Sequence, residues 1–303
     1  MQRIETINNI EEYVKIISEL SKQRRKDCIR DDALLFRGQA NREFQLLPSI
    51  ARTKTNSNSS LLGYESDMIS KAIGKNPEIF YEDKYGINLL VKLQHFGIPT
   101  RLLDVTYNSL VALYFACIDK DEVHDGEVFV FKITGDNGEY VHYYNDASVN
   151  LMSKTYKKKG QYPYKILNFL NDVNIDITDC TNVEEYRKLF KNDISMLVER
   201  IKEPIFVSPV ELSERQKRQQ GTFIIFPNDI KEIENEAFFT ACIKPISKEN
   251  HKIIACLTIP GKIKKELLDK LEFFGITEEF LFPDSVDIIC KTIKENAHRR
   301  LGI

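Results

Sequence analysis

The sequence lacks the features by which several large protein classes are recognised. No apolar run reaches the roughly 18 residues that span a bilayer, and the charged start MQRIETINNIEEYV has no signal-peptide core. The cysteines form no CxxC pair and the histidines no HExxH cluster, which argues against a structural zinc site. We therefore expect a cytoplasmic protein with buried free thiols, no membrane contact and no metal.

Motifs typical of common nucleotide-binding and hydrolytic enzymes are absent as well. The patterns GxxxxGK[ST], GxGxxG and GxSxG do not occur in the chain. The net charge of −2 gives no overall positive field that would attract nucleic acid, although it leaves room for a local basic groove. Composition alone therefore indicates no ligand class and no oligomeric state.

Hydrophobic periodicity predicts an α+β protein. Helical and extended patterns are interspersed without a regular strand–helix–strand rhythm, so we expect a mixed or antiparallel central sheet with helices packed around it. Residues 1–30 are read as an N-terminal helix and connector, and 31–303 as one domain with a polar, irregular insertion at about 140–210. Strands are predicted at 33–38, 127–133, 221–227 and 252–260, and helices at 4–20, 61–74, 88–96, 109–117, 262–274 and 285–299.

The first stretch that suggests chemistry is FRGQ at 36–39. In an extended strand Arg37 shares a face with Leu35, while Gly38 lets a ligand or a neighbouring backbone come close. Gln39 adds an amide beside them. An arginine placed in this way forms a bidentate clamp for phosphate or carboxylate, or it is a structural partner of an internal carboxylate. The sequence leaves both interpretations open.

The second stretch, LQHFGIPTRLLDVTYNSLVALYFA at 93–116, places five polar side chains between two apolar helices. Arg101 and Asp104 are close enough in sequence to pair across a turn, and Asp104 or Thr106 is suited to cap the following helix. A loop braced by a salt bridge and a cap explains the same pattern, and a lone histidine is more often structural. The five side chains are His95, Thr100, Arg101, Asp104 and Thr106.

The third stretch, ERQKRQQGTFIIFP at 214–227, gathers basic and amide side chains immediately before a glycine and a predicted strand. These groups either contact a ligand or form a solvated helix end. They are Arg215, Lys217, Arg218, Gln219 and Gln220.

Together the three stretches resemble the FRG domain family. The matching segments are FRGQ at 36–39, the long motif at 93–116, RQQGTF at 218–223 and GITEEFLFPD at 275–284, so the resemblance runs from about residue 30 to 290. The family usually has tryptophan where this chain has Val105, which implies a change in pocket shape more than in chemistry.

A weaker similarity to ADP-ribosyltransferases implies roles for individual residues. It assigns Arg37 to the phosphates or ribose of NAD, Thr106 or Thr100 to the second motif, and Gln220 or Gln219 to the third. No clear catalytic glutamate follows, beyond Glu211 and Glu214. The implied catalytic residues are Arg37, Thr106 and Gln220, and the implied ligand-binding residues are Arg37, Gly38, Gln39, His95, Thr100, Arg101, Asp104, Arg218 and Gln219.

The resemblance implies a nucleotide-binding protein, with metal-independent ADP-ribosyl transfer or NAD glycohydrolysis in a bacterial toxin or phage-defence setting. One alternative is a non-catalytic nucleotide sensor or nucleic-acid-binding module that uses the basic residues at 24–26, 157–159 and 215–218 as phosphate contacts. Another is that all three stretches only brace the fold.

Overall fold

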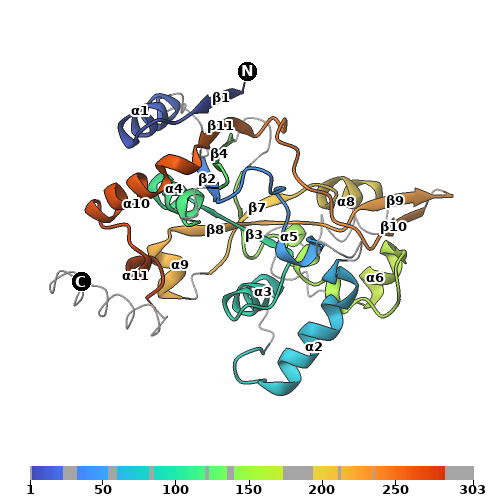
Figure 1. Ribbon diagram of the computed structural model, residues 1–303. Coiled ribbons are helices and arrows are strands. Elements are labelled where there is room, and N and C mark those ends of the chain that lie inside the picture. The colour runs from blue at the N-terminus through green and yellow to red at the C-terminus, as the bar shows by residue number, and fades with distance from the viewer. Residues whose placement is uncertain are drawn as a thin grey trace.

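The molecule is built on an eight-stranded mixed sheet (Figure 1). The computed structural model describes residues 2–22, 33–53, 60–81, 85–119, 123–134, 140–172, 194–210, 213–234 and 236–283. Outer pairs β1–β11 and β5–β7 are parallel and the other pairs are antiparallel. In order across the sheet the strands are β1 (Arg3–Thr6), β11 (Ile253–Ile259), β4 (Gly126–Ile133), β2 (Ala33–Gln39), β3 (Leu102–Thr106), β8 (Gly221–Ile225), β7 (Ile205–Ser208) and β5 (His142–Tyr143).

Helices surround this sheet, and a small second sheet lies at one side. The α+β class and the mixed central sheet are therefore confirmed. The second sheet has the order β6 (Tyr164–Lys165), β10 (Glu236–Phe239) and β9 (Ile230–Ile233). The helices are α1 (Ile10–Ser21), α2 (Glu65–Lys75), α3 (Gly86–His95), α4 (Ser109–Cys117), α5 (Ala147–Ser153), α6 (Ile166–Asp172), α8 (Ile194–Ile201), α9 (Glu214–Arg218), α10 (Lys264–Phe273) and α11 (Glu278–Leu281).

The predicted N-terminal helix is wrong for its first residues. Arg3–Thr6 form β1, which pairs in parallel with β11 at the edge of the main sheet. The side chain of Asn9 accepts a hydrogen bond from the Glu12 amide at 2.8 Å and caps α1. Because the cap sets where the helix begins, the apolar residues before it are free to extend, even though their spacing continues the helical period.

The remaining predicted elements agree with the structure where it describes them. The four predicted strands correspond to β2, β4, β8 and β11. Helix α3 ends at His95, and Gly97 follows two residues later with a φ of 84°, the left-handed conformation common just after a helix terminus. The region 140–210 contains the expected short helices α5, α6 and α8. The helix predicted at 285–299 and residues 173–193 lie outside the described residues, and the division at residue 30 stays a prediction.

Alternating side chains of the strands enter different cores on the two faces of the sheet. Phe36 and Leu102 point to one face and Leu35 and Leu103 to the other, since Phe36 pairs directly with Thr106. Helices α1, α4 and α10 cover the β11–β4–β2 half of the first face. Helices α3 and α5 cover its β3–β8–β7 half. The first face therefore carries two groups of helices with a junction above β2 and β3.

Helix α4 lies unusually close to the sheet at Gly38. A Cβ atom on Gly38 would lie 1.8 Å from the carbonyl oxygen of Ala112, far inside contact distance. The close approach that glycine permits here is therefore that of a neighbouring backbone. The helix is buried on most sides, as its apolar sequence predicts, and Val111, Ala112 and Leu113 are fully inaccessible.

Three cysteines lie in the described part of the chain, and all three are free thiols. Cys117 and Cys256 are buried, as expected, and burial raises the pKa of each thiol to about 12. Cys242 is exposed, which departs from that expectation. Among the described helices, none combines the length and apolar character that a membrane crossing requires.

Candidate functional site

A pocket lies where β2 and β3 part. The two strands pair at a single position, Phe36 with Thr106, whereas β2 and β4 pair along seven residues. Residues 37–39 and 104–105 line the same cavity without pairing to each other, so the cavity occupies the gap between the strands. Its volume is about 310 Å³, within the range of about 300–1,000 Å³ usual for small-molecule sites.

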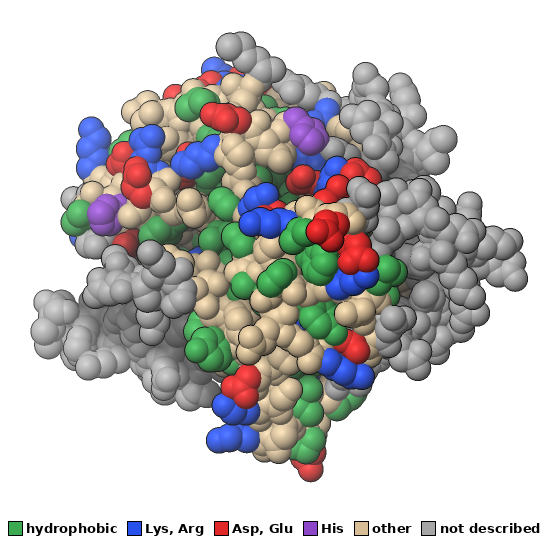
Figure 2. Space-filling view, turned by 90° about the vertical axis from the view of Figure 1, so that its right-hand side faces the viewer, with side chains coloured by type: hydrophobic (Ala, Val, Ile, Leu, Met, Phe, Trp, Pro, Cys, Tyr) green, Lys and Arg blue, Asp and Glu red, His purple; other side chains and the backbone are tan. Residues whose placement is uncertain are grey.

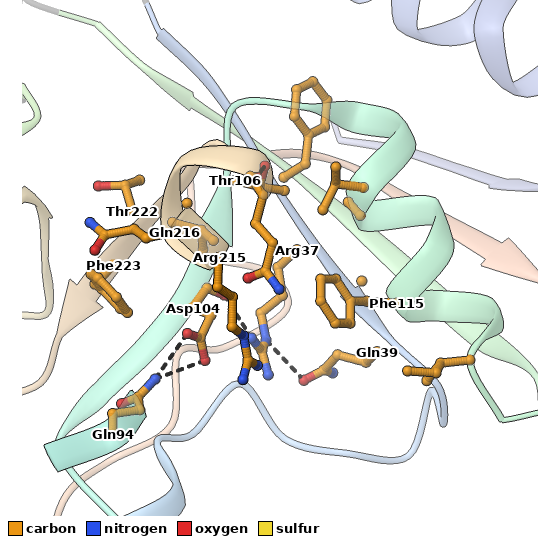
Figure 3. A pocket seen from close by; sticks show the side chains of 18 of the residues that line it. Arg37, Gln39, Gln94, Asp104, Thr106, Phe115, Arg215, Gln216, Thr222 and Phe223 are labelled. Carbon is orange, nitrogen blue, oxygen red and sulfur yellow. Dashed lines mark hydrogen bonds between the residues drawn. The ribbon is translucent and has the colours of Figure 1, made fainter. Parts of the chain in front are cut away.

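All three predicted stretches contribute to this pocket. Figure 3 shows side chains from β2, α3, β3, α4 and α9 directed towards the same space. Apolar groups such as Val91, Phe115 and Phe223 form part of the wall. The principal polar side chains are Arg37, Gln39, Gln94, Asp104, Arg215 and Gln216.

Arg37 is held by neutral acceptors. Its Nη1 donates to the backbone carbonyl of Asp104 at 2.6 Å, and its Nε donates weakly to Gln39 Oε1 at 3.4 Å. Desolvation lowers the pKa of Arg37 to about 10, Asp104 opposes that shift and Arg52 adds to it. The guanidinium is therefore charged at neutral pH. No carboxylate of the described residues forms an ion pair with it.

Two further arginines line the cavity. Arg52 donates from Nε to the Leu47 carbonyl at 3.1 Å, and burial lowers the pKa of Arg52 against the effect of Asp104. Arg215 lies over the ring of Phe282, with its guanidinium carbon 4.5 Å from the ring centroid. Against these three guanidinium groups, Asp104 is the one carboxylate among the lining residues. The pocket therefore carries excess positive charge and suits an anion.

Asp104 is fixed by a short chain of hydrogen bonds. Gln94 Nε2 donates to both carboxylate oxygens of Asp104 at 2.9 Å. The Gln94 Oε1 atom accepts from the hydroxyl of Thr100 at 2.5 Å. Thr100 is buried and does not itself line the pocket, so it contributes to the site through Gln94.

The predicted pairing of Arg101 with Asp104 is wrong. Three positions separate the two residues along extended backbone, so their side chains leave opposite faces. Arg101 is fully buried and pairs with Glu65, with Nε 2.9 Å from Oε1 and a second contact from Nη2 to Oε2. Its Nη1 donates to the carbonyl of Phe226 at 3.0 Å and to Asn228 Oδ1 at 3.2 Å. Arg101 lies outside the pocket lining, and its surroundings are those of a structural brace.

The third stretch contributes one of the three residues that the resemblance assigned there. Gln219 lines the pocket, together with Gln216, whereas Arg218 and Gln220 do not. Gln220 adopts a positive φ of 45°, and its carbonyl accepts from the Tyr107 amide at 3.0 Å, so it shapes the turn before β8. Arg218 is exposed and lies over the ring of Phe280.

Thr106 lines the pocket, but its hydroxyl is already engaged. It donates to the Gln219 carbonyl at 2.6 Å and accepts from the Asn108 amide at 2.9 Å. The predicted helix cap is also displaced, because Asn108 caps α4 by accepting from the Leu110 amide at 3.0 Å and from the Val111 amide at 3.4 Å. Thr106 thus ties β3 to the turn before β8.

Gly38, Gln39, His95 and Val105 all line the pocket, as their motifs suggest. Arg52, Gln94 and Phe115 are lining residues that the sequence prediction did not assign. Gln94 and Phe115 stand inside the second stretch, beside residues that were assigned. Arg52 follows the short helical turn Ser49–Ala51, and no local pattern indicates that this turn brings it to the cavity.

The fold and the pocket define an α+β protein with a cationic cavity at a junction in a mixed sheet. The sequence model of the FRG domain family matches residues 32–125, so this part of the chain is an FRG domain. No curated protein and no solved structure matches the chain. Residues 213–223 complete the pocket from outside the matched region.

Proposed function

We propose that the pocket binds a nucleotide, and that the protein uses NAD for ADP-ribosyl transfer or hydrolyses NAD in a bacterial toxin or phage-defence setting. The observation that carries the proposal is the meeting of Arg37, Arg52 and Arg215 in one cavity with apolar walls. Guanidinium groups bind phosphate through charge-assisted hydrogen bonds, and an aromatic base suits the apolar wall.

Cleavage of the nicotinamide–ribose bond passes through a cation-like state. In the proposed reaction the arginines hold the diphosphate, while side-chain oxygens in the cavity stabilise the developing positive charge. Asp104 and the amides of Gln216 and Gln219 are candidates for this second role. The reaction as proposed uses no metal.

Calorimetric titration with NAD and ADP-ribose, with nicotinamide release followed in parallel, tests the proposal. For Arg37→Ala we expect binding to weaken by about thirtyfold, the equivalent of about 2 kcal/mol for a charged hydrogen-bond donor. Arg42→Ala is the matched control, because Arg42 is an exposed arginine outside the pocket. Equal affinity of wild type and Arg37→Ala for both ligands would contradict the proposal.

A non-catalytic nucleotide sensor is the second candidate, because the described pocket lining includes no glutamate and the Thr106 hydroxyl donates to backbone. Arg37-dependent binding without nicotinamide release supports this candidate. A nucleic-acid module has less support. On the face in Figure 2, basic and acidic side chains of the described residues are interspersed. Lys159, from one of the basic runs considered as phosphate contacts, pairs with Asp172 at 3.5 Å.

A further inference from the structure

Asp104 is out of place in a pocket for an anion. Its carboxylate lies among three arginines, where a negative charge weakens the attraction for phosphate. Its charge stabilises the charged forms of Arg37 and Arg52 at a distance, but Arg37 donates to the carbonyl of Asp104 and not to its carboxylate. Within the described part of the chain the carboxylate forms no ion pair. The carboxylate oxygens are therefore available to a hydrogen-bond donor of a ligand.

The hydrogen bonds behind Asp104 orient its carboxylate and leave it open. Thr100 Oγ1 accepts from the Leu102 amide at 3.2 Å, so its own proton is directed to Gln94 Oε1. The amide group of Gln94 must then present its NH₂ to Asp104, where Nε2 is 2.9 Å from each oxygen. Each carboxylate oxygen retains a lone pair, and the Asp104 side chain is exposed to the cavity.

We infer that Asp104 binds neighbouring hydroxyl groups of a ribose, and that Gln94 and Thr100 are positioning residues for this contact. Two oriented acceptor oxygens match two adjacent hydroxyl donors. The 2.6 Å contact from Arg37 to the Asp104 backbone places a phosphate-binding group beside this acceptor. One ligand therefore supplies both a phosphate and a free diol, which selects ribose phosphates over deoxyribose phosphates and inorganic phosphates. This inference rests on the proposed nucleotide pocket and specifies its ligand.

The test compares ADP-ribose, its two analogues that lack the 2′-hydroxyl on one or the other ribose, and inorganic pyrophosphate. For the wild-type chain we expect at least one deoxy analogue to bind about tenfold more weakly than ADP-ribose, because a charged hydrogen bond is lost. For Asp104→Asn we expect that preference to disappear, while pyrophosphate binds as tightly as in wild type or more tightly, because a repulsive charge is gone.

Variants of Thr100 distinguish a role in positioning Gln94 from a role in folding. Thr100→Val removes the hydrogen bond to Gln94 Oε1, so the Gln94 amide is held only through Asp104, and the preference for ADP-ribose over the deoxy analogue falls. Thr100→Ser keeps the hydroxyl and restores the preference. Urea unfolding of both variants shows that each remains folded at the temperature of the titrations.

Two results overturn the inference, and they are distinguishable from failure of the proposed function. If pyrophosphate and ADP-ribose bind through Arg37 but the wild type does not distinguish the deoxy analogues, the diol contact is wrong and the anion pocket stands. If Asp104→Asn weakens pyrophosphate and ADP-ribose alike, Asp104 is structural. If no phosphate compound binds the wild type, the inference and the proposed function both fail.

Discussion

Two arginines from the recognised sequence stretches, Arg37 and Arg101, have opposite surroundings. Arg101 is fully buried, and Glu65, the Phe226 carbonyl and Asn228 engage its guanidinium. Arg37 faces a cavity, and its described partners are a carbonyl and a weak amide contact. Burial lowers the pKa of both, but the Glu65 carboxylate raises that of Arg101 overall, whereas that of Arg37 stays low, at about 10. A complete set of partners indicates a role in folding, and an incomplete set indicates a ligand.

The largest expected effect on stability comes from substitution of the buried arginine, Arg101. Arg101→Met leaves the Glu65 carboxylate buried without its cation, and loss of one partner of a buried pair costs about 3–5 kcal/mol. We expect urea denaturation to show this loss. The double variant Arg101→Met with Glu65→Leu should recover much of it, because an apolar replacement of a buried pair is often neutral. A single variant as stable as wild type would show that Arg101 is not a brace.

A second expected effect concerns the contact between the sheet and α4. Gly38→Ala places a Cβ atom against the Ala112 carbonyl, and the helix must move away, which we expect to cost about 3 kcal/mol. Gly63→Ala is the matched control, since a Cβ atom there meets nothing within 4 Å. Thermal unfolding of the two variants measures the difference. Equal melting temperatures would contradict the close packing of α4.

A smaller effect is expected at the start of α4. Asn108→Ala removes the side chain that caps two amides of the helix, and such caps contribute about 1 kcal/mol. Asn108→Asp retains the acceptor and should remain close to wild type in stability. Denaturant midpoints of the three proteins compare them directly. A loss in both variants would point to a contact other than the cap.

The smallest expected change in stability belongs to Arg37. Arg37→Met loses two hydrogen bonds and the attraction of Asp104, but it also removes a desolvated charge that repels Arg52. We therefore expect the free energy of unfolding to change by less than about 1 kcal/mol. Its effect is expected on ligand binding. Arg37→Lys keeps the charge but loses the planar fork, and should bind with intermediate affinity. If Arg37→Met were much less stable than wild type, Arg37 would be a structural residue like Arg101.

Hydrophobic periodicity in the sequence predicted most of the individual strands and helices. The apolar run before Arg37 forms a strand, and the apolar stretch 109–117 forms a buried helix, because burial follows periodicity. The long-range partners were not predictable in this way. Glu65 is 36 residues from Arg101, and only the packing of α2 brings them together.

The same dependence on long-range contacts explains which parts of the site the sequence could predict. The three stretches were recognised because each gathers polar groups in an apolar setting, and the structure brings them to one cavity. Gln216 and Gln219 line that cavity, whereas Gln220, at a positive φ, forms the turn before β8, and the sequence does not show which glutamine takes which place. Arg52 reaches the pocket through a loop whose path carries no periodic signal.

The most direct test measures stability and ligand binding together on Arg37→Met and Arg101→Met. Urea unfolding gives the first quantity and calorimetric titration with ADP-ribose gives the second. We expect Arg37→Met to unfold like wild type and to bind about thirtyfold more weakly. We expect Arg101→Met to lose about 3 kcal/mol of stability or more, while its folded fraction still binds. If Arg37→Met loses stability and keeps its affinity, Arg37 is a structural residue and the pocket is not a nucleotide site.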